Sequence, residues 1–219
     1  MKESCPELAR PYLGLVVSGG HTALYRVEEG AAPKLLGETE DDAVGEAFDK
    51  VAKLLGLPFP GGPALAELAA RGREDAFVLP RPRQHEAGYG FSYSGLKTAV
   101  ARLVRAHEPC DDRTRADLAA SFQAAATDVL VHKARRALAD EGLARLAVVG
   151  GVAANRRLRE RVAAAAQRDG FVASFPPPAL CTDNAAMVAA AGARSLAAGE
   201  RHDLDLTAFS RLPLDAGAA

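Results

Sequence analysis

Residues 146–155 read LAVVGGVAAN, a short β-prone apolar run that ends at two glycines and leads into a helical pattern. Nucleotides bind at such strand-to-helix turns in open α/β sheets, because backbone N–H groups without a neighbouring Cβ can face an anion. Asn155 adds a donor and an acceptor in the first helical turn. The spacing does not match G-x-G-x-x-G, which disfavours a Rossmann dinucleotide site. A tight structural turn, with Asn155 near the helix cap, is the competing interpretation.

The sequence on either side of this turn predicts an α/β fold. Two strand–helix units in the C-terminal half imply parallel strands covered by helices, and two β-prone runs around Gly19-Gly20 predict a hairpin. The expected strands are 12–17, 22–27, 34–38, 146–149 and 171–175, and the expected helices are about 44–55, 95–107, 115–138, 154–167 and 184–198. Residues 71–91, rich in Pro, Arg and Gly, are expected to form a surface loop.

The hairpin turn is the second candidate binding element, with the sequence VVSGGHT at 16–22. Consecutive glycines let backbone N–H groups converge on an anion. The Ser18 hydroxyl and a ring nitrogen of His21 could add side-chain donors. An ordinary hairpin turn explains the same residues, and the Ser-Gly-Gly pattern alone favours that interpretation.

The third candidate element is a predicted helix followed by a glycine–proline turn. Its two stretches are DDAVGEAFDK at 41–50 and PGGP at 60–63. On the polar face, pairs of Asp49 with Lys53 and of Glu46 with Lys50 at i,i+4 would contribute about 0.2–0.5 kcal/mol each. Gly45, however, lowers helix propensity by roughly 1 kcal/mol relative to Ala, which indicates that something approaches the helix closely there.

The fourth candidate element is CTDN at 181–184, directly before an alanine-rich helix. Thr182 or Asp183 could cap that helix, which is the default interpretation of an acidic residue at this place. The alternative is that the Asp183 carboxylate faces a metal ion or a phosphate-bound cation.

The composition limits what the protein can bind. With 219 residues, 48% hydrophobic and 25% charged, the chain is typical of a globular protein, and its net charge of -1 gives no general basic field for RNA. An RNA partner would therefore have to meet a local basic patch or another subunit. Three widely spaced cysteines, no run of 18 apolar residues and no signal-peptide pattern predict a cytoplasmic protein without a membrane partner.

Taken together, the motifs resemble those of the TsaD family, the tRNA threonylcarbamoyladenosine transferases, from about residue 12 to residue 199. The matching motifs are SGGHT (18–22), DDAVGEAFDK (41–50), PGGP (60–63), FSYSGLKT (91–98), GGVAANRRLR (150–159) and CTDNAAM (181–187). The resemblance implies an α/β fold of the ASKHA type (actin, sugar kinase, hsp70), with the nucleotide in a cleft between two lobes. Residues 12–219 would form one lobe, and residues 1–11 a disordered or residual N-terminal segment.

The resemblance also implies a reaction and a set of binding residues. The family transfers threonylcarbamoyl from threonylcarbamoyl-adenylate to the adenosine beside the anticodon of tRNA; the adenine amine attacks the carbamoyl carbonyl and AMP leaves. By motif, the substrate's phosphate and acyl region is lined by Val16, Val17, Ser18, Gly19 and Gly20, the ribose by Asp49 and Gly62, and the nucleotide by Asn155, while Asp183 is the carboxylate ligand of an iron or zinc ion. ATP or threonylcarbamoyl-adenylate, tRNA and further subunits of a transferase complex are the implied ligands and partners.

One feature of the family is missing. Its first lobe, with an H-x-x-x-H pair of metal ligands, should precede the Ser-Gly-Gly hairpin, but only a few residues do, and no two of the five histidines are four apart. A single Asp183 cannot hold a transition metal tightly. The sequence therefore predicts either a fragment or a half-protein whose partner chain supplies the first lobe, with an exposed apolar surface where that lobe would pack.

Three other functions can be compared with the same motifs. A noncatalytic nucleotide-binding scaffold fits the missing histidines, whereas a sugar or acetate kinase is disfavoured by the SGGH and CTDN motifs. A peptidase lacks support, because His21 has no evident nucleophile partner and no H-E-x-x-H occurs. The arginines at 156, 157, 159 and 161 could form either an RNA patch or a solvated helix face.

Overall fold

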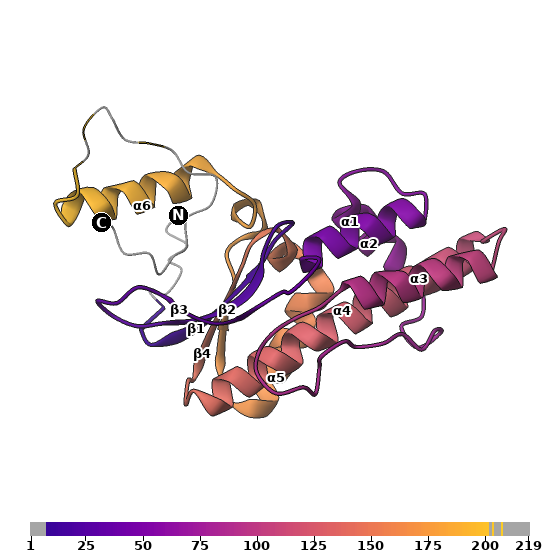
Figure 1. The fold of residues 1–219 in the computed structure, drawn as a ribbon, viewed down its shortest axis with the longest axis horizontal. Coiled ribbons are helices and arrows are strands. Elements are labelled where there is room, and N and C mark those ends of the chain that lie inside the picture. The colour runs from indigo at the N-terminus through magenta and orange to yellow at the C-terminus, as the bar shows by residue number, and fades with distance from the viewer. Residues whose placement is uncertain (1–7, 202, 204–206, 208–219) are drawn as a thin grey trace.

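The structure is a computed structural model, and it describes residues 8–201, 203 and 207. Of the expected N-terminal segment 1–11, residues 8–11 are irregular, and residues 1–7 lie outside the described part. The described elements form a mixed sheet with a set of helices beside it, and the last helix stands apart from that body (Figure 1).

The sheet has five strands in the order β3-β2-β1-β4-β5. The strands are β1 (Tyr12–Val17), β2 (Thr22–Val27), β3 (Lys34–Glu38), β4 (Arg145–Val149) and β5 (Val172–Ser174). β1 and β2 pair antiparallel as the predicted hairpin, and β2 pairs antiparallel with β3. β4 pairs parallel with β1 and with β5, which confirms the parallel strands expected from the strand–helix units.

In the described part of the chain, six α-helices follow the predicted order with one addition. They are α1 (Val44–Leu54), α2 (Gly61–Ala69), α3 (Ser94–Ala106), α4 (Asp112–Asp140), α5 (Arg156–Asp169) and α6 (Ala185–Ala197), with short 3₁₀ turns η1 (Gly151–Ala154) and η2 (Pro178–Leu180). α2 was not predicted, because its opening Gly-Gly-Pro is typical of a loop. Between α2 and α3 the chain is mostly irregular, as expected for 71–91.

The core is centred on α4, which contacts β1, β4 and the four helices α1, α2, α3 and α5. Its buried residues run from Ala116 to Leu138 and are largely alanine, so the neighbouring elements can approach closely. The ring of Phe122 on α4 meets the ring of Phe48 on α1 edge-on at 5.0 Å between centroids. This contact fixes α1 above α4, and α1 in turn reaches the edge of the sheet.

The last helix contributes no buried residue to this core. Its apolar side chains Met187, Val188 and Leu196 are each more than half exposed. Within the described part of the chain, no helix combines the length and the hydropathy needed to cross a bilayer.

Candidate functional site

Two glycine turns meet at one edge of the sheet. β1 and β4 are parallel neighbours with Val16 opposite Val149, so both strands end at the same edge. Gly150 has φ +99°, and a Cβ there would lie only 2.8 Å from the Val17 carbonyl carbon. Both the backbone conformation and the close approach require glycine. The Ser-Gly-Gly hairpin turn and the Gly150-Gly151 turn therefore lie side by side.

The start of α1 packs directly against the hairpin turn through Gly45. The Gly45 amide donates to the Ser18 carbonyl at 3.1 Å. A Cβ on Gly45 would lie 2.5 Å from that oxygen and 2.8 Å from the Gly19 nitrogen. The close approach predicted from the low helix propensity of Gly45 is confirmed, and the group that approaches is the hairpin turn itself.

Asp49 lies one helical turn beyond Gly45 and connects α1 to α2. Its Oδ1 accepts hydrogen bonds from the backbone amides of Gly61 at 2.9 Å and Gly62 at 3.2 Å. The predicted pair of Asp49 with Lys53 is therefore wrong, because the unsatisfied amides at the start of α2 attract the carboxylate instead. The companion pair of Glu46 with Lys50 is confirmed at 2.8 Å.

The glycines around this edge fall into two groups. A Cβ at Gly45, Gly61 or Gly150 would overlap neighbouring atoms, so these glycines serve packing. At Gly19, Gly20 and Gly62, by contrast, no atom lies within 4 Å of the position of a Cβ, and no left-handed φ requires glycine. We call these three the open glycines. They leave bare backbone facing free space, which is what a ligand needs to approach main-chain N–H groups.

The hairpin turn already directs amides toward one oxygen atom. The Ser18 Oγ accepts from the Gly20 amide at 3.3 Å and from the His21 amide at 3.0 Å, and the Ser18 amide donates to the His21 carbonyl at 2.8 Å. The Ser18 hydroxyl thus closes the turn rather than standing free. Both amides are therefore already used inside the turn, and an anion-binding role for the turn stays a prediction.

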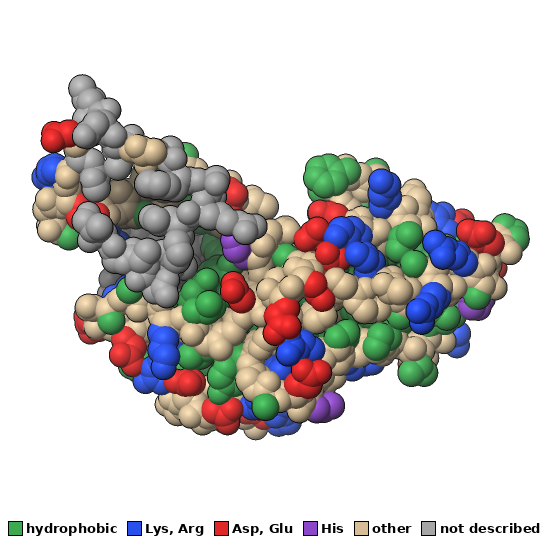
Figure 2. Space-filling model, viewed as in Figure 1, with side chains coloured by type: hydrophobic (Ala, Val, Ile, Leu, Met, Phe, Trp, Pro, Cys, Tyr) green, Lys and Arg blue, Asp and Glu red, His purple; other side chains and the backbone are tan. Residues whose placement is uncertain are grey.

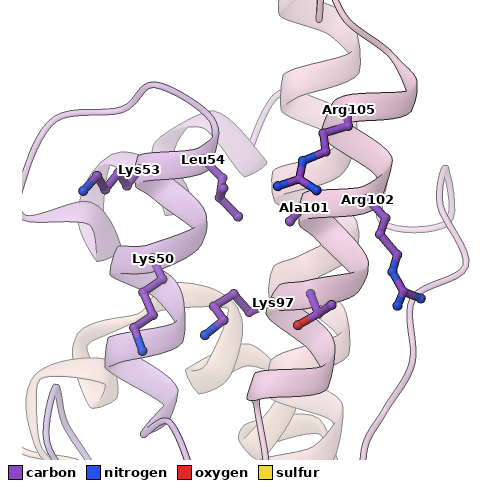
Figure 3. A pocket seen from close by; sticks show the side chains of 8 residues that line it. Lys50, Lys53, Leu54, Lys97, Ala101, Arg102 and Arg105 are labelled. Atoms are coloured by element: carbon purple, nitrogen blue, oxygen red, sulfur yellow. The ribbon is translucent and has the colours of Figure 1, made fainter.

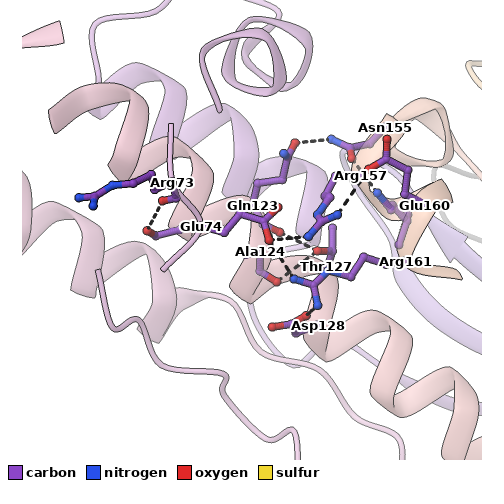
Figure 4. Close-up of polar contacts among 12 residues, drawn as sticks. Arg73, Glu74, Gln123, Ala124, Thr127, Asp128, Asn155, Arg157, Glu160 and Arg161 are labelled. Carbon is purple, nitrogen blue, oxygen red and sulfur yellow. Dashed lines mark hydrogen bonds and ion pairs between the residues drawn. The ribbon is translucent and has the colours of Figure 1, made fainter. Parts of the chain in front are cut away.

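Asn155 is held in place by both of its side-chain groups. Its Oδ1 accepts from the Leu158 amide at 3.0 Å and caps α5, and its Nδ2 donates to Oε1 of Gln123 on α4 at 2.8 Å (Figure 4). The capping interpretation is confirmed. The contact with α4 also fixes the amide plane at the end of the Gly150-Gly151 turn.

Three arginines that follow Asn155 are bound within the fold. Figure 4 shows Arg157 and Arg161 converging on Glu74, with N–O distances of 2.5 and 3.1 Å, and Arg161 also pairs with Asp128 at 2.5 Å. Arg159 donates to two backbone carbonyls, each at 2.7 Å. These side chains join α5 to α4 and to neighbouring loops, so they do not form a free RNA patch.

The segment before α6 lies beside the glycine turns. Asn184, rather than Thr182 or Asp183, caps α6, because its Oδ1 accepts from the Met187 amide at 3.0 Å. A Cβ on Gly151 would lie 3.9 Å from the Thr182 methyl group. The capping role predicted for Thr182 or Asp183 is therefore wrong. Asp183 is exposed and makes no hydrogen bond or ion pair with any described residue.

The metal expectation does not fit the residues present. Within the described ranges, no group of three or more His, Cys, Asp or Glu side chains could hold a metal ion. Transition-metal sites in proteins use three or four protein ligands, so Asp183 alone is not such a site. No step of the chemistry below is derived through a metal.

The acidic pair Asp41-Asp42 organises the neighbouring helix α3. Asp41 accepts from the Ser92 hydroxyl at 2.5 Å and from the Tyr93 and Ser94 amides at 2.8 and 3.3 Å. Burial opposes the charge of Asp41, but these hydrogen bonds outweigh it and hold its pKa below the usual value. The FSYSGLKT motif is thus tied to the DDAVGEAFDK motif, a link that no sequence spacing indicates.

Comparison with known proteins connects this site to a family. A family model described as "TsaD: tRNA N6-adenosine threonylcarbamoyltransferase" matches residues 2–190. Proteins named tRNA N6-adenosine threonylcarbamoyltransferase are 56% identical over 88% of this chain in Aromatoleum aromaticum, 52% over 94% in Symbiobacterium thermophilum and 50% over 95% in Geobacter sulfurreducens. The chain spans 56%, 60% and 62% of the length of these relatives, respectively.

Two solved structures share the fold at low sequence identity. The phosphate- and nucleotide-bound form of full-length HypF is similar with a TM-score of 0.63 and 12% identity, covering 80% of this chain and 38% of that one. HypF from T. kodakarensis is similar with a TM-score of 0.54 and 20% identity, covering 78% of this chain and 22% of that one. At these identities the likeness concerns the fold.

Proposed function

The chain belongs to the tRNA N6-adenosine threonylcarbamoyltransferase (TsaD) family, and we propose that it forms the part of that enzyme that holds the adenylate half of its substrate. Its fold is an ASKHA-type α/β lobe. Because the chain spans 56–62% of its relatives, the remainder of the family enzyme lies outside the sequence in hand, and the activity of the whole is part of the proposal.

The observation that carries the proposal is the group of open glycines. A glycine in a structured segment costs roughly 0.5–1 kcal/mol relative to alanine. Neither a close contact nor a left-handed φ requires glycine at Gly19, Gly20 or Gly62; Gly192 on α6 is open as well, so the place of the three glycines carries the argument. Gly19 and Gly20 follow β1 at the edge where nucleotides bind in such sheets, and Gly62 is linked to α1 through Asp49. A ligand that contacts main-chain N–H groups accounts for this arrangement.

Each site residue receives a role in this proposal. The segment Val16–Gly20 would line the phosphate and acyl region, where the bare backbone at Gly19 and Gly20 would meet the negative charge. The Oδ2 of Asp49 has no hydrogen bond to a described residue and would accept one from a ribose hydroxyl. Its Oδ1 would keep its hydrogen bonds to the amides of α2. Gly62 would leave room for the ribose, and Asn155 would present its remaining N–H to the nucleotide.

The reaction transfers the threonylcarbamoyl group from its mixed anhydride with AMP. The exocyclic amine of the tRNA adenosine attacks the carbamoyl carbonyl, a C–N bond forms, the C–O bond to AMP breaks, and the amine loses a proton. This chain would bind the AMP half and stabilise the growing negative charge on the leaving phosphate through the bare backbone at Gly19 and Gly20. Asp183 would contribute one carboxylate if the complete enzyme holds iron or zinc.

The partners follow from the same proposal. We expect tRNA, further subunits of a threonylcarbamoyl-transferase complex and a segment or chain that supplies the other lobe. A cytoplasmic location is proposed because the reaction requires tRNA and because three cysteines, odd in number and widely spaced in the sequence, suit a reducing compartment.

A chimaera tests the proposal. The N-terminal part of the Geobacter relative, fused ahead of this chain, should transfer labelled threonylcarbamoyl from the adenylate to tRNA. Gly20→Ala in the chimaera should lower the rate by about tenfold or more, since about 1.4 kcal/mol of lost binding corresponds to tenfold. Gly192→Ala, an equally open glycine on α6, is the matched control and should keep full activity.

A noncatalytic nucleotide-binding partner of the same family is the second candidate function. In this candidate the same residues would bind adenine nucleotide, and no group transfer would follow. A chimaera that folds and binds adenine nucleotide but transfers nothing to tRNA would support this second candidate and count against the enzyme.

A further inference from the structure

A basic groove runs between α1 and α3. Its volume is about 790 Å³, and its lining residues are Lys50, Lys53, Leu54, Lys97, Thr98, Ala101, Arg102 and Arg105. Five of the eight are cationic and none is acidic. Figure 3 shows Lys97 and Arg105 extending from α3 toward α1, whereas Lys53 extends from α1 away from α3 and Arg102 points to the outer side of α3. Several Lys and Arg side chains gather at this end of the molecule in Figure 2.

Only one end of the groove is neutralised by the fold. Asp42 bridges Lys50 at 2.6 Å and Lys97 at 2.9 Å, and Glu46 adds a second contact to Lys50. Burial of Asp42 opposes its charge, but the hydrogen bonds from the two lysines hold its pKa below the usual value. This bridge fixes the spacing of α1 and α3 and leaves the cations farther along the groove free.

The remaining three cations have no carboxylate partner. Lys53, Arg102 and Arg105 are exposed and form no ion pair with any residue between 8 and 201. The contrast with a second hollow of about 420 Å³ is informative, since there Arg135 is paired with Asp169. In a chain of net charge -1, the α1–α3 groove is a local concentration of unbalanced positive charge.

The shape of the groove favours a chain of anions over a single one. Lys97 and Arg105 are eight residues apart on one helix, which is about 12 Å along its axis. Most of the accessible lining surface is nevertheless apolar, although Leu54 and Ala101 are the only apolar residues that line the groove. The cations therefore carry the preference for a nucleic acid, because their spacing along α3 suits the phosphates of a nucleic-acid backbone.

The groove also leads to the candidate site. α1 begins where Gly45 contacts the hairpin turn, and Lys50 and Lys53 follow about 8 and 12 Å farther along the same helix. A polynucleotide in the groove would therefore run toward the edge at which the open glycines lie.

We propose that the groove between α1 and α3 binds the phosphate backbone of the tRNA and holds it beside the nucleotide-binding edge. The proposal rests on the proposed function, which supplies RNA as the substrate. Phosphate contacts position a nucleic acid without reading its sequence, so the groove should set affinity and orientation rather than the choice of tRNA.

The test is RNA binding by the full chain as a function of salt. A labelled anticodon stem-loop RNA is titrated with wild type, with Lys53→Gln/Arg105→Gln and with the control Lys34→Gln/Arg168→Gln, which removes two exposed cations from β3 and α5. Each phosphate contact contributes a slope of about 0.7–0.9 in log K against log salt. The slope of log K against log salt should be smaller by about 1.4–1.8 for the groove variant than for wild type. If the two proteins bind equally at 1 M salt, the variant should then bind about 25- to 60-fold more weakly at 0.1 M salt. The control should match wild type.

Two results would overturn the proposal. One is equal affinity and equal slope for the groove variant and the wild type. The other is an acidic peptide, such as polyglutamate, that displaces the RNA at an equal or lower concentration of charge, because the groove would then be a protein-docking surface. Nucleotide binding is measured on the same variants. If the groove variant keeps both nucleotide binding and wild-type RNA binding, the groove proposal fails and the proposed function stands. If wild type binds no nucleotide, the proposed function fails.

Discussion

Replacing Gly45 by alanine should destabilise the protein, although alanine is the better helix former. The new Cβ would lie 2.5 Å from the Ser18 carbonyl oxygen, about 1 Å inside ordinary contact, so the turn or the helix must move. Such overpacking costs about 1–3 kcal/mol, and loss of the Gly45–Ser18 hydrogen bond adds about 0.5–1.5 kcal/mol. The gain in helix propensity returns at most about 1 kcal/mol. The net loss is therefore about 0.5–4.5 kcal/mol.

Urea unfolding followed by circular dichroism measures this loss. Gly62→Ala is the matched control, because it lies in the first turn of α2 with no atom within 4 Å of a Cβ. Its free energy of unfolding should equal that of wild type or exceed it by up to about 1 kcal/mol. If Gly45→Ala were as stable as Gly62→Ala, the close contact between α1 and the hairpin turn would be refuted.

Two further perturbations address the carboxylates beside the site. Asp49→Ala should lower the free energy of unfolding by about 0.5–2 kcal/mol, because it removes the acceptor for two amides at the start of α2. Asp49→Asn should recover part of this loss. Equal stability of wild type and both variants would contradict the role of Asp49 in holding α2. The pKa of Asp41 is lowered in the folded state, so its contribution is complete above a pH of about 3.9 and is lost as the pH falls through the folded pKa. Between about pH 6 and about pH 3, the free energy of unfolding should therefore fall less for Asp41→Asn than for wild type. An equal fall would refute the stabilising role of the Asp41 carboxylate.

Most of the fold could be predicted from local patterns. The strands of the hairpin and the two parallel strands of the C-terminal half follow from short β-prone runs bounded by Gly, Pro or charged residues, and α4 follows from its long alanine-rich periodicity. α2 could not be predicted in this way. Its first turn contains Gly61, Gly62 and Pro63, and the carboxylate that satisfies its amides comes from Asp49 on another helix.

The candidate site was predictable only in part, for the same reason. The two glycine turns were identified because each directly follows a strand, and the low helix propensity of Gly45 indicated a close contact. The hydrogen-bond partner of a polar side chain depends on the tertiary fold. Asp49, for example, accepts from amides 12 and 13 residues away rather than pairing with Lys53. The basic groove could not be predicted, because Lys53 and Arg105 are far apart in sequence and meet only when α1 and α3 pack together.

Calorimetric titration of ATP into the chain tests the central claim most directly. Wild type should bind the nucleotide. Gly20→Ala should bind it at least about tenfold more weakly, with an unchanged midpoint of thermal unfolding. Gly192→Ala should bind it as wild type does. This outcome is expected because a methyl group on Gly20 meets no atom of the protein and would meet only the ligand. Equal binding by Gly20→Ala and Gly192→Ala, or no binding by wild type, would contradict the account.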